Sequence, residues 1–291
     1  MPIRRLHSDI VNFTTPSLRS RAVPLLLAGT LLGVPIAVGV GYLVAGALGF
    51  VGNTATGGVT RVLANGTVFR SALLSLWIAT VGTSLATVGA LVVAFTFDGN
   101  RTLDRQARRA AVLPLPVPMV AAAVAVLLLL SQSGWLARVA ASVRLISAPA
   151  EFPALVYDPF AIGVIVAVVW KEMPFLLLLA ASLLSMRGSA LVDAARTLGA
   201  TRWQTVRRIT LPMLLRGMAP SIIAVFVFVL GSLELPLVLA PSSPLALPML
   251  IQERRQSLDM ASHGEAYVIA LLATVLALLA VVTHEWLRDD A

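Results

Sequence analysis

The chain has 291 residues, of which 58% are hydrophobic and 12% are charged, and its mean hydropathy is +0.90. Soluble domains carry about 25% charged residues, so this composition excludes a soluble protein and indicates an integral membrane protein. The sequence contains no cysteine, which excludes disulfides, thiolate metal sites and cysteine nucleophiles.

Six apolar stretches reach the ~20 residues that a helix needs to cross the bilayer core. The first follows the basic segment 1–22 and exceeds the ~7–15-residue apolar core of a cleaved signal peptide, so we expect an uncleaved span. The third begins among three prolines, which a span end tolerates where neighbours satisfy the freed carbonyls. We predict an all-α integral membrane protein with a single transmembrane domain, residues 1–291, and about six transmembrane helices: 23–50, 71–97, 111–133, 160–186, 218–240 and 266–286.

The basic residues predict the orientation. Fifteen of the 22 lysines and arginines fall in the N-terminal segment, the second-to-third loop, the fourth-to-fifth loop and the C-terminal tail, which lie on one side if there are six spans. Cytoplasmic loops carry the excess of Lys and Arg, so we expect both termini in the cytoplasm and a multi-pass protein of the bacterial plasma (inner) membrane. The net charge of +8 then reports topology, and no nucleic-acid partner is expected.

The fourth-to-fifth loop contains an unusually polar stretch, DAARTLGATRWQTVRRITLP, residues 193–212. We expect a helix from Asp193 to Leu198, a turn at Gly199, and a second helix that Thr201 caps and Pro212 ends. These elements form an amphipathic helix-turn-helix elbow on the cytoplasmic surface.

The second helix of this elbow has one apolar face. Trp203, Val206 and Ile209 recur at the spacing of a single helix face, while three arginines lie off that stripe. An interfacial helix on anionic headgroups and a docking surface for a cytoplasmic partner both fit this pattern. A DNA-binding helix-turn-helix does not, because the elbow lies between two spans against the bilayer.

The elbow resembles the EAA loop of permease subunits of bacterial type I ABC importers. That loop has an acidic residue, two alanines, three further residues, a glycine, and a run ending in Leu-Pro; here Asp stands where Glu is usual. The resemblance extends weakly over residues 72–286. It implies that the loop of about residues 187–212 is a coupling helix-turn-helix between spans 4 and 5. The coupling residues would be Asp193, Ala194, Ala195, Gly199, Ala200, Arg202, Leu211 and Pro212.

The resemblance also implies partners. These are a cytoplasmic ABC ATPase dimer, an extracytoplasmic substrate-binding protein and a second permease subunit, a heterodimer being favoured over a homodimer. The chain has no phosphate-binding GxxxxGKS or GxxxxGKT pattern. We therefore expect no catalytic residue, no metal site and no cofactor in this chain, with ATP and Mg bound by the separate ATPase subunit.

Ionisable residues within predicted spans are candidates for the translocation path. Lys171 and Glu172 fall in the fourth span and Glu234 in the outer half of the fifth; such residues face the bundle interior or a water-filled path. Trp170 is a further candidate, either as a stacking residue on the path or as a packing residue. Two structural alternatives stay open: Lys171 forms an ion pair with Glu234, or Glu234 reaches the external interface. Glu253 and Glu265 are interpreted as plain loop acids.

The stretches DPFAIGVIVAVVWKEMPF and LELPLVL are most similar to the branch of the family that handles spermidine and putrescine, iron, thiamine or aminophosphonates. An acidic passage suits an amine such as a polyamine. The rival classes are a stand-alone secondary transporter and a membrane-embedded enzyme. Neither the inverted repeat typical of the first nor the cluster of acids or histidines required by the second is visible in the sequence.

Overall fold

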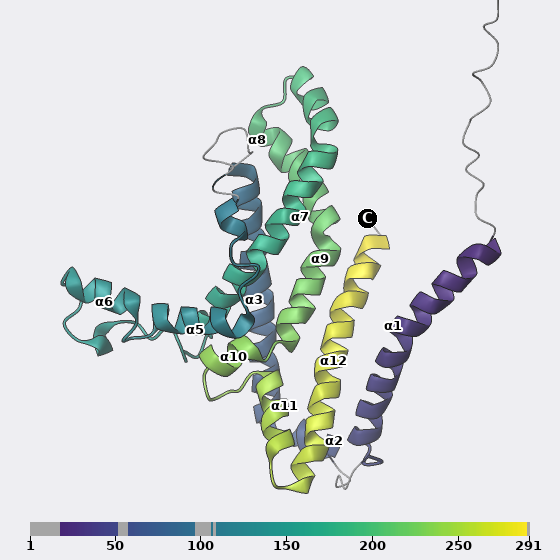
Figure 1. Cartoon of the computed structure of the whole chain (residues 1–291), viewed down its shortest axis with the longest axis vertical. Helices are drawn as coiled ribbons and strands as arrows, with labels where there is room; N and C mark the ends of the chain where they lie inside the picture. The colour runs from purple at the N-terminus through teal and green to yellow at the C-terminus, as the bar shows by residue number, and fades with distance from the viewer. Residues whose placement is uncertain (1–17, 52–57, 97–105, 107–108, 290–291) are drawn as a thin grey trace, which may run out of the picture.

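The computed structural model describes residues 18–51, 58–96, 106 and 109–289, and the regular structure in that part of the chain is helical (Figure 1). A π-helical turn, Val206–Thr210, joins α8 to α9, and a short 3-10 turn spans Pro149–Glu151. The helices are α1 (Leu18–Ala47), α2 (Gly58–Ala64), α3 (Gly66–Thr96), α5 (Met119–Leu130), α6 (Trp135–Ser142), α7 (Ile162–Thr197), α8 (Arg202–Thr205), α9 (Leu211–Gly231), α10 (Glu234–Leu239), α11 (Leu247–Gln256) and α12 (Met260–Asp289).

Six helical stretches among the described residues are long and apolar enough to cross a membrane, which confirms the predicted all-α fold with six spans. The fourth span, Ile162–Ser185, agrees with the predicted 160–186, and the helix α7 continues beyond it to Thr197. The first half of the elbow is therefore the end of α7 and not a separate helix.

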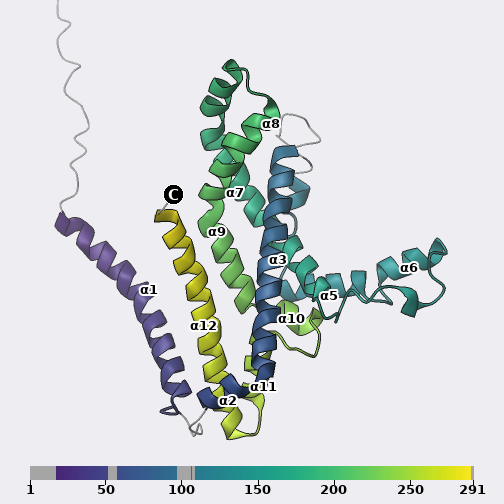
Figure 2. The same ribbon diagram turned by 180° about the vertical axis from the view of Figure 1, so that it is seen from behind.

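The third and fifth spans differ most from the prediction. The third candidate span, Met119–Ser142, consists of two helices, α5 and α6. The helix α5 alone has 12 residues, about 18 Å at 1.5 Å per residue, which is shorter than the ~30 Å hydrocarbon core. A turn at residues 131–134 leads to α6, and the two helices project sideways from the bundle (Figures 1 and 2). The fifth span ends at Gly231, where Ser232 turns extended, and the short α10 then packs against α5 and α7.

Small residues bring the two central helices together. Ala79, Ala86 and Ala90 of α3 are fully buried, and they share a face with Gly82. A Cβ atom at Gly82 would lie 2.8 Å from Cγ1 of Val168 on α7. Small side chains at this spacing let membrane helices approach closely, so α3 and α7 form the centre of the bundle, against which α9 packs.

The outer helices α1 and α12 pack along each other. At one end of this pair the Tyr267 ring lies over Gly46, where a Cβ would come within 2.5 Å of the ring. Tyr42 meets Tyr267 edge to face, with ring centroids 5.8 Å apart. Most other large side chains of α1 are exposed, so this helix offers its apolar surface to lipid or to another subunit.

The two ends of the bundle are distinct. The elbow lies at one end, towards which the start of α1 and the end of α12 point, and α2 and α11 lie at the other (Figures 1 and 2). This arrangement agrees with the predicted sidedness of the loops, and it leaves the elbow projecting beyond the membrane-spanning helices.

We predict that Gly82→Ala destabilises the bundle by about 1–3 kcal/mol, because the added methyl forces α3 away from Val168. The measurement is the thermal unfolding of the purified chain in lipid nanodiscs. Gly39→Ala on α1 is the matched control, since a Cβ there has no neighbour within 4 Å. An equal melting temperature for the two variants would contradict this account of the α3–α7 contact.

Candidate functional site

The turn of the elbow is a Schellman motif at the end of α7. The Gly199 N–H donates to the carbonyl of Arg196 at 3.0 Å, and the Ala200 N–H donates to that of Ala195 at 3.0 Å. Gly199 has a φ of +82°, the left-handed conformation that this motif requires and that glycine adopts without strain. The predicted turn at Gly199 is confirmed.

A capping box starts the second half of the elbow. Thr201 Oγ1 accepts a hydrogen bond from the Gln204 N–H at 3.3 Å, and Gln204 Oε1 accepts one from the Thr201 N–H at 2.9 Å. The predicted N-cap at Thr201 is confirmed. The reciprocal role of Gln204 was missed, although Thr-x-x-Gln is the sequence signature of this device.

The prediction that Pro212 ends the second helix is wrong. The chain is helical from Arg202 to Gly231, and the π-helical turn Val206–Thr210 lies just before the proline, with the Leu211 N–H donating to the Val206 carbonyl. In a regular α-helix the ring of Pro212 would clash with the carbonyl four residues earlier. The wider π register removes that clash, so the second half of the elbow continues directly into α9.

The outward surface of the elbow carries exposed apolar side chains. Leu198 is 89% exposed and Trp203 is 69% exposed, whereas Thr205 and Thr210 are buried. The sequence assigned Trp203 to one face with Val206 and Ile209; those two are half-buried, and Trp203 instead points away from the chain.

The other coupling candidates occupy both arms of the elbow. On the first arm Ala194 is exposed and Ala195 is buried, and Asp193 lies in α7 with its side chain outside the described part of the structure. Arg202 and Pro212 are exposed on the second arm. The predicted residues therefore gather on one protrusion.

A hollow of about 440 Å³ lies beneath the elbow. The elbow therefore does not pack closely against the bundle at this place. The hollow is lined by the ends of α3 and α7 and by the second arm: Ala94, Phe95, Ala181, Leu184, Ser185, Val192, Arg196, Arg202, Thr205, Val206 and Thr210.

A second space, an open groove of about 400 Å³, contains two of the predicted path residues, Lys171 and Glu172. Trp170 and Glu234 are not among its lining residues. The groove lies between α7 and α9, and its remaining wall comes from the turn before α5 and the start of that helix: Leu115, Met119, Phe175, Ala224, Val225 and Phe228.

The ion pair between Lys171 and Glu234 is not formed. The Lys171 ammonium instead donates to the backbone carbonyls of Pro114, Leu115 and Val117, at 2.9, 3.2 and 2.6 Å. Glu234 is exposed at the start of α10, where its carboxylate accepts a hydrogen bond from the Ser232 hydroxyl at 3.3 Å. It therefore follows the end of α9 and is not part of a continuous fifth span.

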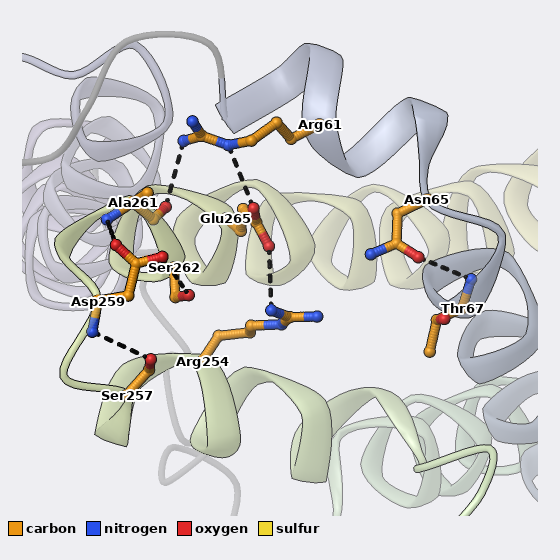
Figure 3. Close-up of polar contacts among 9 residues, drawn as sticks. All are labelled: Arg61, Asn65, Thr67, Arg254, Ser257, Asp259, Ala261, Ser262 and Glu265. Atoms are coloured by element: carbon orange, nitrogen blue, oxygen red, sulfur yellow. Dashed lines mark hydrogen bonds and ion pairs between the residues drawn. The ribbon is translucent and has the colours of Figure 1, made fainter.

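Glu265 is not the plain loop acid that the sequence suggested. It lies in α12, and Figure 3 shows its carboxylate between Arg61 of α2 and Arg254 of α11. The Arg61 Nε is 3.2 Å from one carboxylate oxygen and the Arg254 Nη1 is 3.5 Å from the other. Arg61 also donates to the carbonyl of Ala261 at 3.3 Å. This cluster holds three helices together at the end of the bundle opposite the elbow.

An all-helical bundle with six candidate spans, a projecting elbow and an open groove has the architecture of a multi-pass membrane protein. Residues 86–288 match the family of binding-protein-dependent transport system inner membrane components. The chain therefore belongs to this family, and it is the inner-membrane permease subunit of an ABC importer and not an enzyme. The sulfate transport system permease protein CysW of Synechocystis sp. is 28% identical over 220 residues, covering 72% of this chain and 75% of that protein.

Solved transporters share the fold. The bacterial ABC transporter that imports the acidic polysaccharide alginate aligns with a TM-score of 0.73 at 18% identity, over 94% of this chain and 95% of that chain. Its complex with an alginate pentasaccharide-bound periplasmic protein gives 0.69 at 18% identity, over 92% of each. The inward-facing MetNI methionine ABC transporter gives 0.56 at 16% identity, over 81% of this chain and 99% of that chain.

We predict that Glu265→Gln lowers the stability of the external end by about 1–2 kcal/mol, because two arginines lose their shared carboxylate. Hydrogen exchange of α2 and α11 in nanodiscs measures this local loss. Glu253→Gln, an exposed acid on α11, is the control. If both variants exchange alike, Glu265 does not hold these helices.

Proposed function

We propose that the chain forms the translocation path of the importer and takes up the motion of a cytoplasmic ATPase dimer through its elbow. The observation that carries this proposal is the apolar tip, Leu198 and Trp203, whose side chains are largely exposed. Exposed Trp and Leu at the centre of a basic protrusion provide the anchor and rim that a protein interface uses.

The two arms of the elbow connect this tip to the groove. The first arm is the end of α7, and the second runs into α9 without a helix break. The same two helices carry most of the groove lining, including Glu172 and Phe228. A displacement of the elbow therefore changes the separation of the groove walls, which is the movement that alternating access requires.

The assembly that this function needs follows the sequence expectations. The ATPase dimer supplies ATP and Mg, and this chain holds no cofactor. A second permease subunit, a paralogue in preference to another copy, completes the path, and an extracytoplasmic binding protein delivers substrate. The alginate transporter, whose structure includes a periplasmic protein, supports the last partner by analogy of fold. Both termini are assigned to the cytoplasm.

The proposed substrate is a small amine-bearing solute, such as a polyamine. Glu172 is the acid in the groove lining, and the N–H donors of the neighbouring Lys171 ammonium are engaged by three carbonyls, which leaves Glu172 as the lining group that can accept hydrogen bonds from an amine. The other lining residues are apolar, which suits an alkyl chain. The named relative is a sulfate permease, so the test of this proposal compares uptake of an amine with uptake of an anion.

For docking, we predict that Trp203→Ala lowers recovery of the ATPase subunit with the tagged chain roughly tenfold or more. Truncation of a buried interface tryptophan commonly costs about 2 kcal/mol or more. The measurement is affinity purification from native membranes in mild detergent, with partners quantified by mass spectrometry. Gly199→Trp should likewise uncouple or disassemble the importer, since the turn requires a positive φ.

Trp135→Ala is the matched control, because Trp135 is 61% exposed on α6, which projects sideways from the bundle and away from the elbow. It should leave ATPase recovery unchanged. Normal recovery and uptake with both Trp203→Ala and Gly199→Trp would make the elbow an interfacial helix.

For the substrate, we predict that Glu172→Gln lowers uptake of an amine substrate about tenfold, equivalent to a loss of about 1.4 kcal/mol, with assembly intact. Uptake of radiolabelled spermidine, putrescine and sulfate by cells expressing the complete importer tests this. Glu234→Gln is the comparison, since Glu234 lies outside the groove lining. Sulfate uptake that Glu172→Gln leaves unchanged, without amine uptake in the unmodified importer, would refute the amine proposal.

A further inference from the structure

Lys171 is a buried cation in the middle of an apolar span. Its residue is 7% exposed, and it lies within the membrane stretch Ile162–Ser185. A charged group at this depth is costly unless it is fully hydrogen-bonded. The three carbonyls of Pro114, Leu115 and Val117 provide that satisfaction, because an ammonium has three N–H donors.

The sequence explains why these carbonyls are available. Pro114, Pro116 and Pro118 lack backbone N–H groups, so the turn that they interrupt cannot run as a regular α-helix. The Pro114 carbonyl also accepts a hydrogen bond from the Val117 N–H at 3.2 Å, so the ammonium is its second donor. For the carbonyls of Leu115 and Val117 the ammonium supplies a hydrogen bond in a region without water, where an unpaired group costs several kcal/mol. The lysine and the proline-rich turn therefore satisfy each other, although they are more than 50 residues apart in the chain.

This contact joins two walls of the groove. Leu115 belongs to the turn and Met119 starts α5, and both line the groove; Glu172 and Phe175 line it from α7. Lys171 lies between these sets and bonds the turn to α7. A change in the position of α7 therefore pulls on the turn through three hydrogen bonds.

We propose that the carbonyls of Pro114, Leu115 and Val117 form a cation-binding cradle whose resident cation is the Lys171 ammonium, and that this bond makes the proline-rich wall of the groove move with α7. Lys171 is then a positioning residue and does not contact the substrate. The cradle itself stands on the hydrogen bonds. The part concerning motion rests on the proposed coupling of α7 to the elbow.

The cradle selects the chemistry of its cation. Three carbonyls around one nitrogen suit an alkylammonium, whose donors point in three directions, whereas the planar guanidinium of arginine directs its donors in a fixed fork. When Lys171→Ala removes the side chain beyond Cβ, the missing atoms are those of n-propylammonium. That ion is the probe for the empty cradle, and n-propanol is its neutral counterpart of the same length.

The experiment measures the distance between the turn and α7 in the full chain in nanodiscs. The sequence has no cysteine, so Leu113→Cys and Leu178→Cys introduce the two spin-label sites; both positions are exposed. We expect one narrow distance distribution in this background. Lys171→Ala should broaden it about twofold as the turn opens locally, and n-propylammonium should restore it while n-propanol should not. Lys171→Met, which keeps the bulk without the charge, should broaden it and resist rescue, and it serves if Lys171→Ala does not fold.

Two outcomes would overturn the proposal. The first is an unchanged distribution in both Lys171→Ala and Lys171→Met. The second is rescue that disappears when Glu172→Gln is added to Lys171→Ala, which would place the amine at the groove acid and not at the carbonyls. The distance measurement needs neither ATP nor a partner, so a negative result in the ATPase-recovery experiment does not change it. A negative result in the distance measurement likewise leaves the ATPase-recovery experiment valid.

Discussion

The bilayer core lacks water, so each backbone N–H and C=O group there needs a hydrogen-bond partner within the protein. This requirement is hardest to meet where a helix is interrupted, and the groove wall and the elbow of this permease both contain such interruptions. Three of the breaks or irregular turns come with a local arrangement that meets this requirement. The proline-rich turn receives the Lys171 ammonium, α7 ends in a Schellman motif at Gly199, and a π-helical turn accommodates Pro212. These three arrangements lie beside the groove and in the elbow, where the chain departs from straight helices.

The elbow is connected to the bundle by continuous helices. The elbow has one sharp turn, at Gly199, and each arm on either side is joined to a long helix without interruption. A capping box and a Schellman motif make that turn rigid. In the proposed function, a rigid turn would transfer a displacement to α7 and α9, whereas a flexible loop would absorb it.

The sequence predicted the features that depend on local patterns. Hydropathy located the six spans, and the residue types at Gly199 and Thr201 predicted the turn and the cap. What it missed depends on partners distant in the chain or on geometry. Glu265 meets arginines from two other helices, and Lys171 is satisfied by backbone carbonyls, which carry no side-chain signature. Proline usually ends a helix, so the sequence placed a stop at Pro212, where the π register permits continuation. Trp203 fits an apolar stripe, but the stripe does not say which of its members face away from the bundle.

The charges of the groove bear on what it transports. In the sequence, a lysine and a glutamate are adjacent in one span, which suggests a passage lined by both positive and negative charge. The structure places both in the groove lining, with the ammonium held by three backbone carbonyls. Those hydrogen bonds to neutral groups leave the charge of the lysine in place, so its field offsets that of Glu172 beside it. In the proposed function the sign of the substrate therefore depends on the composition of the whole path, including what the second permease subunit contributes. In a heterodimer a paralogue can change that sign without any alteration of this chain.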